Sequence, residues 1–193
     1  MNNDVTTKHT KGTKNKAYPK YKPSGVEWLG DVPEHWGVKK LKHTANLYGR
    51  IGFRGYTTDD LVDEGEGAIT LSPSNMKDGE LHLEKSTYIS WEKYYESPEI
   101  VIRPEDVVIV KTGSTFGKIS YVRQVEHPIT LNPQLAVFKS LKCNNRFFFF
   151  YIGAPYIQDQ ISLSNTGSTI PTMTQQTIMS YAIPLPPLPE QQA

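Results

Sequence analysis

Short apolar runs, separated by turns rich in glycine and proline, occupy most of the chain beyond residue 38. Five runs of four or five residues predict strands, and a further short strand is expected from Val38. These five runs lie at 68–71, 87–90, 107–111, 118–122 and 135–139. The third and fourth flank the sequence TGSTFG, and two such runs around glycines predict a β-hairpin.

Helical periodicity is confined to short stretches. In the segment 144–163, aromatic and aliphatic residues at i and i+4 predict a helical region that Gly153 and Pro155 interrupt. Ser90 is expected to cap a short helix in WEKYYES, and a brief helix is expected at 58–62. A capping-box pattern at 172–175 predicts the start of another. Short strands mixed with few helices favour an α+β domain of twisted, mostly antiparallel sheets.

The last residues read AIPLPPLPEQQ. A strand-like run at 179–183 meets prolines at 184, 186, 187 and 189. Because proline fixes φ and has no backbone N–H, we expect 184–189 to leave the sheet as a stiff extended strut. Glu190 is expected to begin a helix, so the chain is interpreted as a globular head cut from a longer construction.

Charge is balanced over the whole chain but not along it. The 193 residues contain 21 Lys+Arg and 20 Asp+Glu, a net charge of +1, yet residues 1–22 hold six lysines and one aspartate. The remainder therefore carries about −4. We expect residues 1–20 to be a disordered basic arm, which is either an inert terminus or a phosphate-binding tail. The expected division is this arm, a globular domain at 21–185, and a proline exit with the start of a helix at 186–193.

Composition excludes several classes of protein. Cys143 is the single cysteine, which excludes an internal disulfide and a thiolate zinc site, and the five histidines show no i, i+4 pair. No apolar run approaches the ~20 residues that span a bilayer, and the N-terminus is polar, so a cytoplasmic protein without membrane contact is expected. Catalytic motifs are also missing: the chain has no Gly-x-Ser-x-Gly and no Asp-x-Lys or Glu-x-Lys. Asn132-Pro133-Gln134-Leu135 lacks the second proline and the aromatic residue of the amine-holding element of methyltransferases.

Two loops have the composition of phosphate contacts. TGSTFGK at 112–118 fails the P-loop pattern, because three residues separate its glycines and Ile119 replaces the required Ser/Thr. It remains a glycine-containing hairpin tip with hydroxyls and flanking lysines, which suits a sugar-phosphate chain as well as it suits a plain turn. NTGSTIPTMT at 165–174 is similarly rich in hydroxyls, and a capped turn explains only part of it.

Four segments in this order resemble the specificity subunit of type I restriction-modification systems. They are YKPSGVEWLGDVPEHWGVKKLK, LSPSNMKDGEL, VVIVKTGSTFGKISYV and the stretch from FFFFYIGAPY to the proline exit. The likeness extends from Tyr21 to Gln192. It implies a target recognition domain that reads one half of a bipartite DNA target and is not itself an enzyme. In that family two such domains are joined by two long helices that dock methyltransferase (M) subunits.

The resemblance also implies the partners: double-stranded DNA, M subunits and a restriction (R) subunit. S-adenosylmethionine, ATP and Mg would bind to those subunits, and no cofactor is expected in this chain. Only one domain is present, so the chain is expected to be a fragment or a half-subunit that self-associates. The charge of about −4 outside the arm leads us to expect weak DNA binding by this domain alone.

We expect loops around 50–54, 74–77, 112–118 and 166–172 to line the DNA-facing side. Lysines and hydroxyls would hold phosphates, Arg50 or Arg54 would read guanine, and Asn75 or Asn165 would read adenine. For the arginines, a solvated surface position or an ion pair with Asp59 or Asp60 is the alternative. The full set of expected DNA contacts is Arg50, Arg54, Ser74, Asn75, Lys77, Lys111, Thr112, Ser114, Thr115, Lys118, Asn165, Ser168, Thr169 and Thr172.

Two rival interpretations stay open. The chain is also compatible with the excised recognition domain of a fused restriction endonuclease or methyltransferase, whose catalytic part would lie outside it. A protein-docking head on a stalk is the third interpretation, and it predicts no DNA retention at any salt concentration.

Overall fold

The computed structural model describes residues 18–50, 55–164 and 172–193, and the chain divides after Glu34 into two compact units. In the first unit, β1 (Tyr21–Pro23) pairs antiparallel with β2 (Asp31–Pro33). A 3₁₀ turn, η1 (Glu27–Leu29), connects them, and Ser24 N donates to Gly30 O at 3.0 Å. Gly30 has φ of 63°, a conformation that favours glycine, so it suits the point where the chain turns back into β2.

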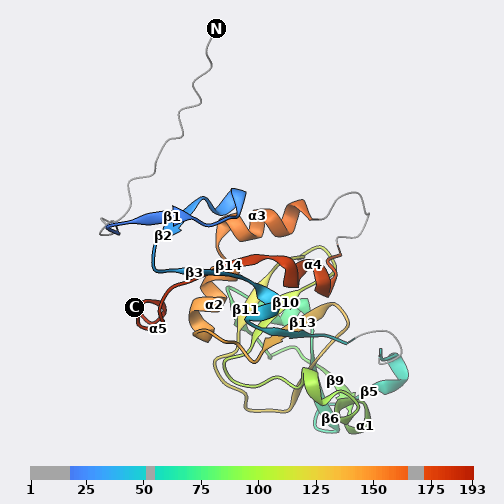
Figure 1. Cartoon of the computed structure of the whole chain (residues 1–193). Helices are drawn as coiled ribbons and strands as arrows, with labels where there is room; N and C mark the ends of the chain where they lie inside the picture. Colours follow the sequence, from blue (N-terminus) through green and yellow to red (C-terminus); the bar gives the residue numbers. More distant parts are fainter. Residues whose placement is uncertain (1–17, 51–54, 165–171) are drawn as a thin grey trace. The chain divides into compact units, whose positions relative to one another are not determined.

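Two four-stranded sheets organise the second unit, His35–Ala193 (Figure 1). The first is antiparallel throughout, in the order β11 (Ile119–Tyr121), β10 (Val107–Val110), β13 (Leu135–Lys139), β4 (Asn46–Tyr48). The second has the order β12 (Ile129–Leu131), β6 (Gly67–Leu71), β9 (Thr87–Ser90), β5 (Leu61–Val62), and its β12–β6 pair is parallel. The five predicted strands and the predicted hairpin are confirmed, and no strand end is shifted by more than one residue.

The apolar core lies between these sheets. β10 and the first four residues of β13 are buried on both faces, which is why VVIV and LAVF read as continuous apolar runs rather than alternating ones. One face of this pair joins β6 and β12 in a cluster that includes Val108, Val110, Leu71 and Leu131. On the other face Phe138 meets Phe148 with ring centroids 4.9 Å apart.

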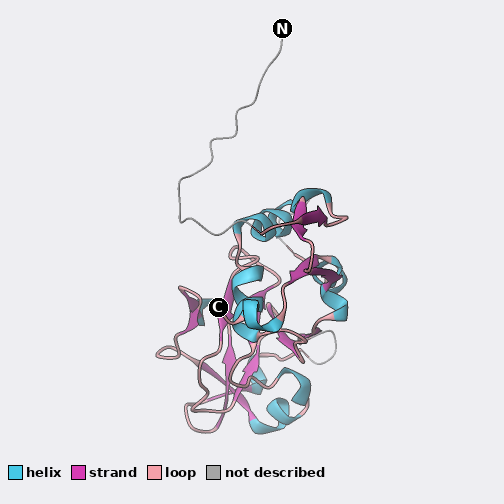
Figure 2. Ribbon diagram, turned by 60° about the vertical axis from the view of Figure 1, so that its left-hand side comes forward, coloured by secondary structure: helices cyan, strands magenta, loops and turns pink. Residues whose placement is uncertain are grey.

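Helices are short, and long loops make up much of the remainder (Figure 2). The α-helices are α1 (Trp91–Tyr95), α2 (Asn145–Ile152), α3 (Pro155–Leu163), α4 (Gln175–Ser180) and α5 (Leu188–Gln191). The 3₁₀ turns of this unit include η2 (Leu41–His43), η4 (Thr58–Asp60), η5 (Pro73–Asn75) and η6 (Pro98–Ile100). Within the described ranges, no helix has the length and apolar character that a membrane crossing requires.

The predicted helix boundaries mostly hold. Ser90 Oγ accepts from Lys93 N at 3.4 Å and caps α1 as expected. Gly153 follows α2, and Pro155 occupies the first position of α3, where its missing N–H costs nothing. The predicted break between two helices is therefore confirmed.

Two predictions near the end of the chain are wrong. The helix after the hydroxyl-rich loop begins at Gln175, capped by Thr174, whose Oγ1 accepts from Thr177 N at 3.0 Å. Thr172 instead forms a β-bridge with Thr112.

The proline strut also begins later than expected. β14 (Ala182–Leu185) pairs antiparallel with β3 (Gly37–Lys40), and Pro184 lies opposite Val38 within that ladder. Among the described strands β14 pairs only with β3, so Pro184 can sit in it without depriving a second strand of a donor.

The last helix is fastened to the segment before β3. Glu190 Oε2 accepts from Trp36 Nε1 at 2.9 Å, and Glu190 Oε1 lies 2.6 Å from His35 Nε2. Asn144 N donates to Gln191 Oε1 at 2.7 Å. Together with the β3–β14 ladder, these bonds anchor the proline-rich exit to the unit from which it leaves.

Glu190→Ala should lower the free energy of unfolding by about 1–2 kcal/mol, because the half-buried indole N–H of Trp36 loses its acceptor. Urea titration followed by tryptophan fluorescence measures this. The exposed Gln192→Ala is the matched control and should change stability by less than about 0.5 kcal/mol. Equal stability of the two variants would show that the contacts of Glu190 with Trp36 and His35 contribute nothing to stability.

Candidate nucleic-acid interface

The carboxyl ends of four strands lie together where β13 begins. β6 and β12 are parallel, so they end at the same edge, and Asn132 N donates to Leu71 O at 2.9 Å just past both ends. β10 and β4 both run antiparallel to β13 and therefore also end towards its first residue, Leu135.

Polar segments that are distant in sequence meet at this edge. Thr112 and Thr172 form a β-bridge, and Met173 N donates to Lys111 O at 2.9 Å. Lys111 N in turn donates to Gln134 O at 2.8 Å. We define the strand-end surface as the group Gly49, Ser72, Lys111, Thr112, Asn132, Gln134, Thr172 and Gln175.

Close packing at Gly49 adds the end of β4 to this group. A β-carbon built on Gly49 would lie 3.0 Å from Leu135 O and 3.4 Å from both Lys111 Cε and Gln175 Nε2. A larger residue would push these neighbours apart, so glycine is the residue that permits the three strands to converge here.

The segments that form this edge contain no acidic residue. The chain has 20 Asp+Glu, yet none falls in 49–50, 72–75, 111–118, 132–134 or 172–175. Their polar side chains are lysine, arginine, hydroxyl and amide groups, which are the groups that contact phosphates and base edges. The edge is therefore suited to a polyanion even though the chain is nearly neutral.

Lys111 is the cation at the centre of this edge. Its side chain is half-buried, and desolvation lowers the pKa of Lys111. Among the described residues no carboxylate pairs with its ammonium group. An approaching phosphate would supply the missing counter-charge.

The rest of the 112–118 loop extends away from the bridge with Thr172. Ser114 and Thr115 are exposed at its tip, while Gly117 packs against α3. Gln158 Nε2 donates to Gly117 O at 3.2 Å, and a β-carbon on Gly117 would lie 2.9 Å from Ile161 Cγ2. The tip is thus held by the protein on one side and presents its hydroxyls on the other.

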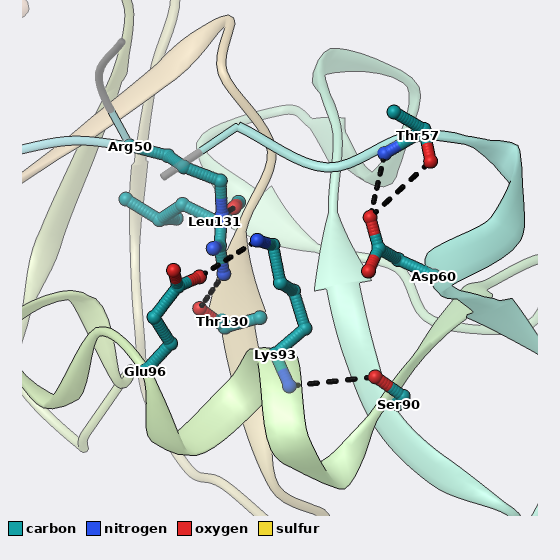
Figure 3. A network of polar contacts seen from close by, with 8 residues as sticks. All are labelled: Arg50, Thr57, Asp60, Ser90, Lys93, Glu96, Thr130 and Leu131. Atoms are coloured by element: carbon teal, nitrogen blue, oxygen red, sulfur yellow. Dashed lines mark hydrogen bonds and ion pairs between the residues drawn. The ribbon is translucent and has the colours of Figure 1, made fainter. Parts of the chain in front are cut away.

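Arg50 has a structural position, and the expectation that it reads a base is corrected by the geometry. Its side chain is 2% exposed. Nε donates to Leu131 O at 3.0 Å, an Nη donates to Thr130 Oγ1 at 3.2 Å, and the guanidinium lies 5.7 Å from the centre of the Tyr56 ring. Figure 3 shows the side chain directed towards β12, near Glu96.

The alternative placing of Arg50, at the solvent or paired with Asp59 or Asp60, is not observed either. Desolvation lowers the pKa of Arg50, and the charge of Glu96 opposes this effect. Asp60 instead accepts from Thr57 N at 2.8 Å and stabilises the turn η4 (Figure 3). Arg50 ties the end of β4 to β12.

Asn75 is likewise committed to the protein. It is 3% exposed, its Oδ1 accepts from Ser72 N at 3.0 Å, and its Nδ2 donates to His82 O and Lys85 O, each at 3.1 Å. The expectation that it reads adenine is therefore corrected. The Ser-x-x-Asn spacing of a capping box was the sequence signal for this role.

The remaining expected contacts divide into two groups. Ser74 stays next to the strand-end surface, since its Oγ lies 2.7 Å from Ser72 Oγ, whereas Lys77 lies on the hairpin of β7 (Met76–Lys77) and β8 (Glu80–Leu81). Arg54, Asn165, Ser168 and Thr169 lie outside the described residues.

A comparison with models of protein families shows which family the chain belongs to. Residues 33–193 match the model of the type I restriction modification DNA specificity domain. The chain belongs to this family.

Curated relatives and solved structures agree with this membership. The MjaVIII specificity subunit of a type I restriction enzyme from Methanocaldococcus jannaschii is 24% identical over 98% of this chain, and the putative MjaX specificity subunit is 26% identical over 98%. This chain covers 46% and 43% of their lengths, so it spans less than half of each relative.

Solved structures establish the fold independently. A chain from a study of complex assembly and conformational transition of the type I R-M system superposes with a TM-score of 0.64, at 20% identity, over 84% of this chain and 37% of its own. The HsdS subunit from Thermoanaerobacter tengcongensis gives 0.58, at 16% identity, over 89% and 37%. The α+β class with mostly antiparallel sheets and few helices is thereby confirmed.

Sequence reasoning missed four polar residues of the strand-end surface. Ser72, Asn132, Gln134 and Gln175 lie on this surface but were not among the expected contacts. Asn132-Pro133-Gln134 was weighed only as a methyltransferase element, and its place between two buried strands was the available signal. Within the described residues no group of three His, Cys, Asp or Glu is arranged to hold a metal ion.

Arg50→Met should lower the free energy of unfolding by about 2–4 kcal/mol, because the buried acceptors on Thr130 and Leu131 lose a charged donor. Chemical denaturation measures the loss. Arg103→Met, at an exposed position, is the control and should stay within about 0.5 kcal/mol of wild type. A stable Arg50→Met protein with impaired DNA binding would instead restore the base-reading role.

Proposed function

We propose that this chain is a DNA-recognition domain that reads one half of a bipartite target for a type I restriction-modification system. The observation that carries the proposal is the strand-end surface, where lysine, hydroxyl and amide groups from separate segments meet without a carboxylate among them. Family membership supports the same function, since the family is that of DNA specificity domains.

In the proposed mode the strand-end surface lies on duplex DNA. Lys111 and the hydroxyls of Thr112 and Thr172 contact phosphate oxygens and fix the register of the protein on the duplex. Ser114, Thr115 and Lys118 extend these contacts along the hairpin tip, and Ser74 forms the flank. Amide side chains then reach base edges in the major groove, where all four base pairs are distinguishable.

We further propose that this chain performs no chemistry itself. Methyltransferase and restriction subunits would bind S-adenosylmethionine, ATP and Mg, extrude the target adenine and modify or cleave the DNA. A second recognition domain, from the same protein or from a second copy of this chain, would read the other half-site. Family membership favours this arrangement over the recognition domain of a fused endonuclease or methyltransferase.

Salt-dependent DNA binding tests the proposal directly. The chain should retain mixed-sequence duplexes at low ionic strength, with an affinity that falls steeply as salt is added, because phosphate contacts release counterions. Fluorescence anisotropy of a labelled duplex measures this. Failure to retain any duplex at any salt concentration would favour the protein-docking alternative.

The biological function has a second readout. Sequencing of modified bases in a host that carries the gene with its methyltransferase genes should reveal a split motif with modified adenines. Modification confined to a short continuous motif would contradict the bipartite reading.

Lys111→Met should weaken DNA binding without harming the fold. One lost phosphate contact reduces the slope of log K against log[salt] by about 0.9. The pKa of Lys111 is lower in the folded protein than in the unfolded chain, so burial of its charged form lowers the stability of the fold. This cost is fully present at a pH below the folded-state pKa, and it is gone at a pH above the unfolded-state pKa. At neutral pH the variant should therefore be at least as stable as wild type.

Lys142→Met is the matched control for this prediction. Lys142 is exposed and follows the end of β13 opposite to the strand-end surface. Its replacement should leave the affinity almost unchanged. Equal losses from both lysine variants would place the DNA elsewhere on the molecule.

A further inference from the structure

Gln134 has a backbone that is fixed on three sides. Gln134 N donates to Asn132 Oδ1 at 2.9 Å, its carbonyl accepts from Lys111 N at 2.8 Å, and the following Leu135 N donates to Asn132 O at 3.2 Å. These bonds hold the residue in the tight connection between β12 and β13, two strands that are buried along almost their whole length. Its Cα therefore has little freedom, although the residue itself is exposed.

The side-chain amide of Gln134 is also oriented before any ligand arrives. Asn132 Nδ2 donates to Gln134 Oε1 at 3.3 Å, which uses one of the two lone pairs of that oxygen. Asn132 is 8% exposed, so the positioning residue is fixed in the protein while the amide that it orients faces solvent.

Gly113 provides the space in which this amide lies. A β-carbon built on Gly113 would come within 3.1 Å of Gln134 Nε2, and the φ of Gly113 is 111°, a conformation that side-chain-bearing residues rarely adopt. The hairpin loop therefore passes beside the amide without covering it. Lys111 and Thr112, the proposed phosphate contacts, come directly before Gly113 in the chain.

We infer that Gln134 is a specificity-determining residue that reads an adenine in the half-site, an inference that rests on the proposed function. A glutamine amide pairs bidentately with adenine in the major groove, donating to N7 and accepting from the N6 amino group. The free lone pair of Oε1 and the Nε2 hydrogens supply both halves of this pairing. Because Asn132 holds the amide in place, little rotamer entropy is lost on binding.

The test is selection of randomised duplexes at low salt by wild type, Gln134→Ala and Gln134→Glu, followed by sequencing of the retained DNA. Wild type should enrich a motif with an adenine that Gln134→Ala no longer selects, a loss of about 5- to 150-fold in preference at that position only. Gln134→Glu should shift the same position towards cytosine, whose amino group a carboxylate accepts from.

The remaining outcomes separate the inference from the proposed function. Gln124→Ala, in the loop after β11 where Gln124 Nε2 donates only locally to Glu126 Oε1 at 3.0 Å, is the control and should preserve the whole motif. A motif that is identical in wild type and both Gln134 variants overturns the inference and leaves the function intact. Uniform weakening at every position, with an unchanged unfolding midpoint, also overturns it. No enrichment by wild type overturns the proposed function and the inference together.

Discussion

The parallel pairing of β6 with β12 is the constraint on which the strand-end surface depends. Parallel neighbours end at the same edge, so the chain beyond each strand, Ser72 on one side and Asn132 on the other, emerges at the same place. A long connection separates β6 from β12 in the sequence, and β12 is followed after three residues by β13 of the other sheet. Arg50 then ties the end of β4 to β12 through Leu131 and Thr130. Without this pair, Ser72 would not emerge beside Asn132, which β12 carries to the start of β13.

Local sequence signals predicted the elements and the β10–β11 hairpin, but they did not indicate how the other strands pair. VVIVK, LAVFK and the Gly153–Pro155 break each specify their own structure, because burial on both strand faces and a helix stop are written into adjacent residues. The roles of Arg50 and Pro184 depend on strands far away in the sequence. Nothing near Arg50 distinguishes an arginine that braces β12 from one at the surface, and Pro184 is tolerated only because β14 has a single neighbour.

Net charge by itself says little about the proposed interface, for a related reason. Net charge does not say where the charged residues lie, because the fold brings some segments together and separates others. The segments at the strand-end surface contain none of the 20 acidic residues, so a domain of about −4 outside its arm still has an edge without carboxylates in its own segments. A net charge of +1 over the whole chain predicts little long-range electrostatic steering of DNA.

The strand-end surface also separates folding from recognition at the level of single residues. Lys111 and Gln134 use their backbone N–H and C=O groups to join strands, and Thr112 and Thr172 form a bridge through the main chain. Side chains at these positions contribute little to those bonds. Exchange of one such side chain would therefore alter the chemistry of the proposed DNA contact and leave the main-chain framework in place. Buried Arg50 and Asn75 lack this freedom, because their side chains themselves hold the loops together. We therefore expect that substitutions at the ends of strands can change the proposed DNA target at little cost in stability, because these side chains make few of the bonds that hold the fold.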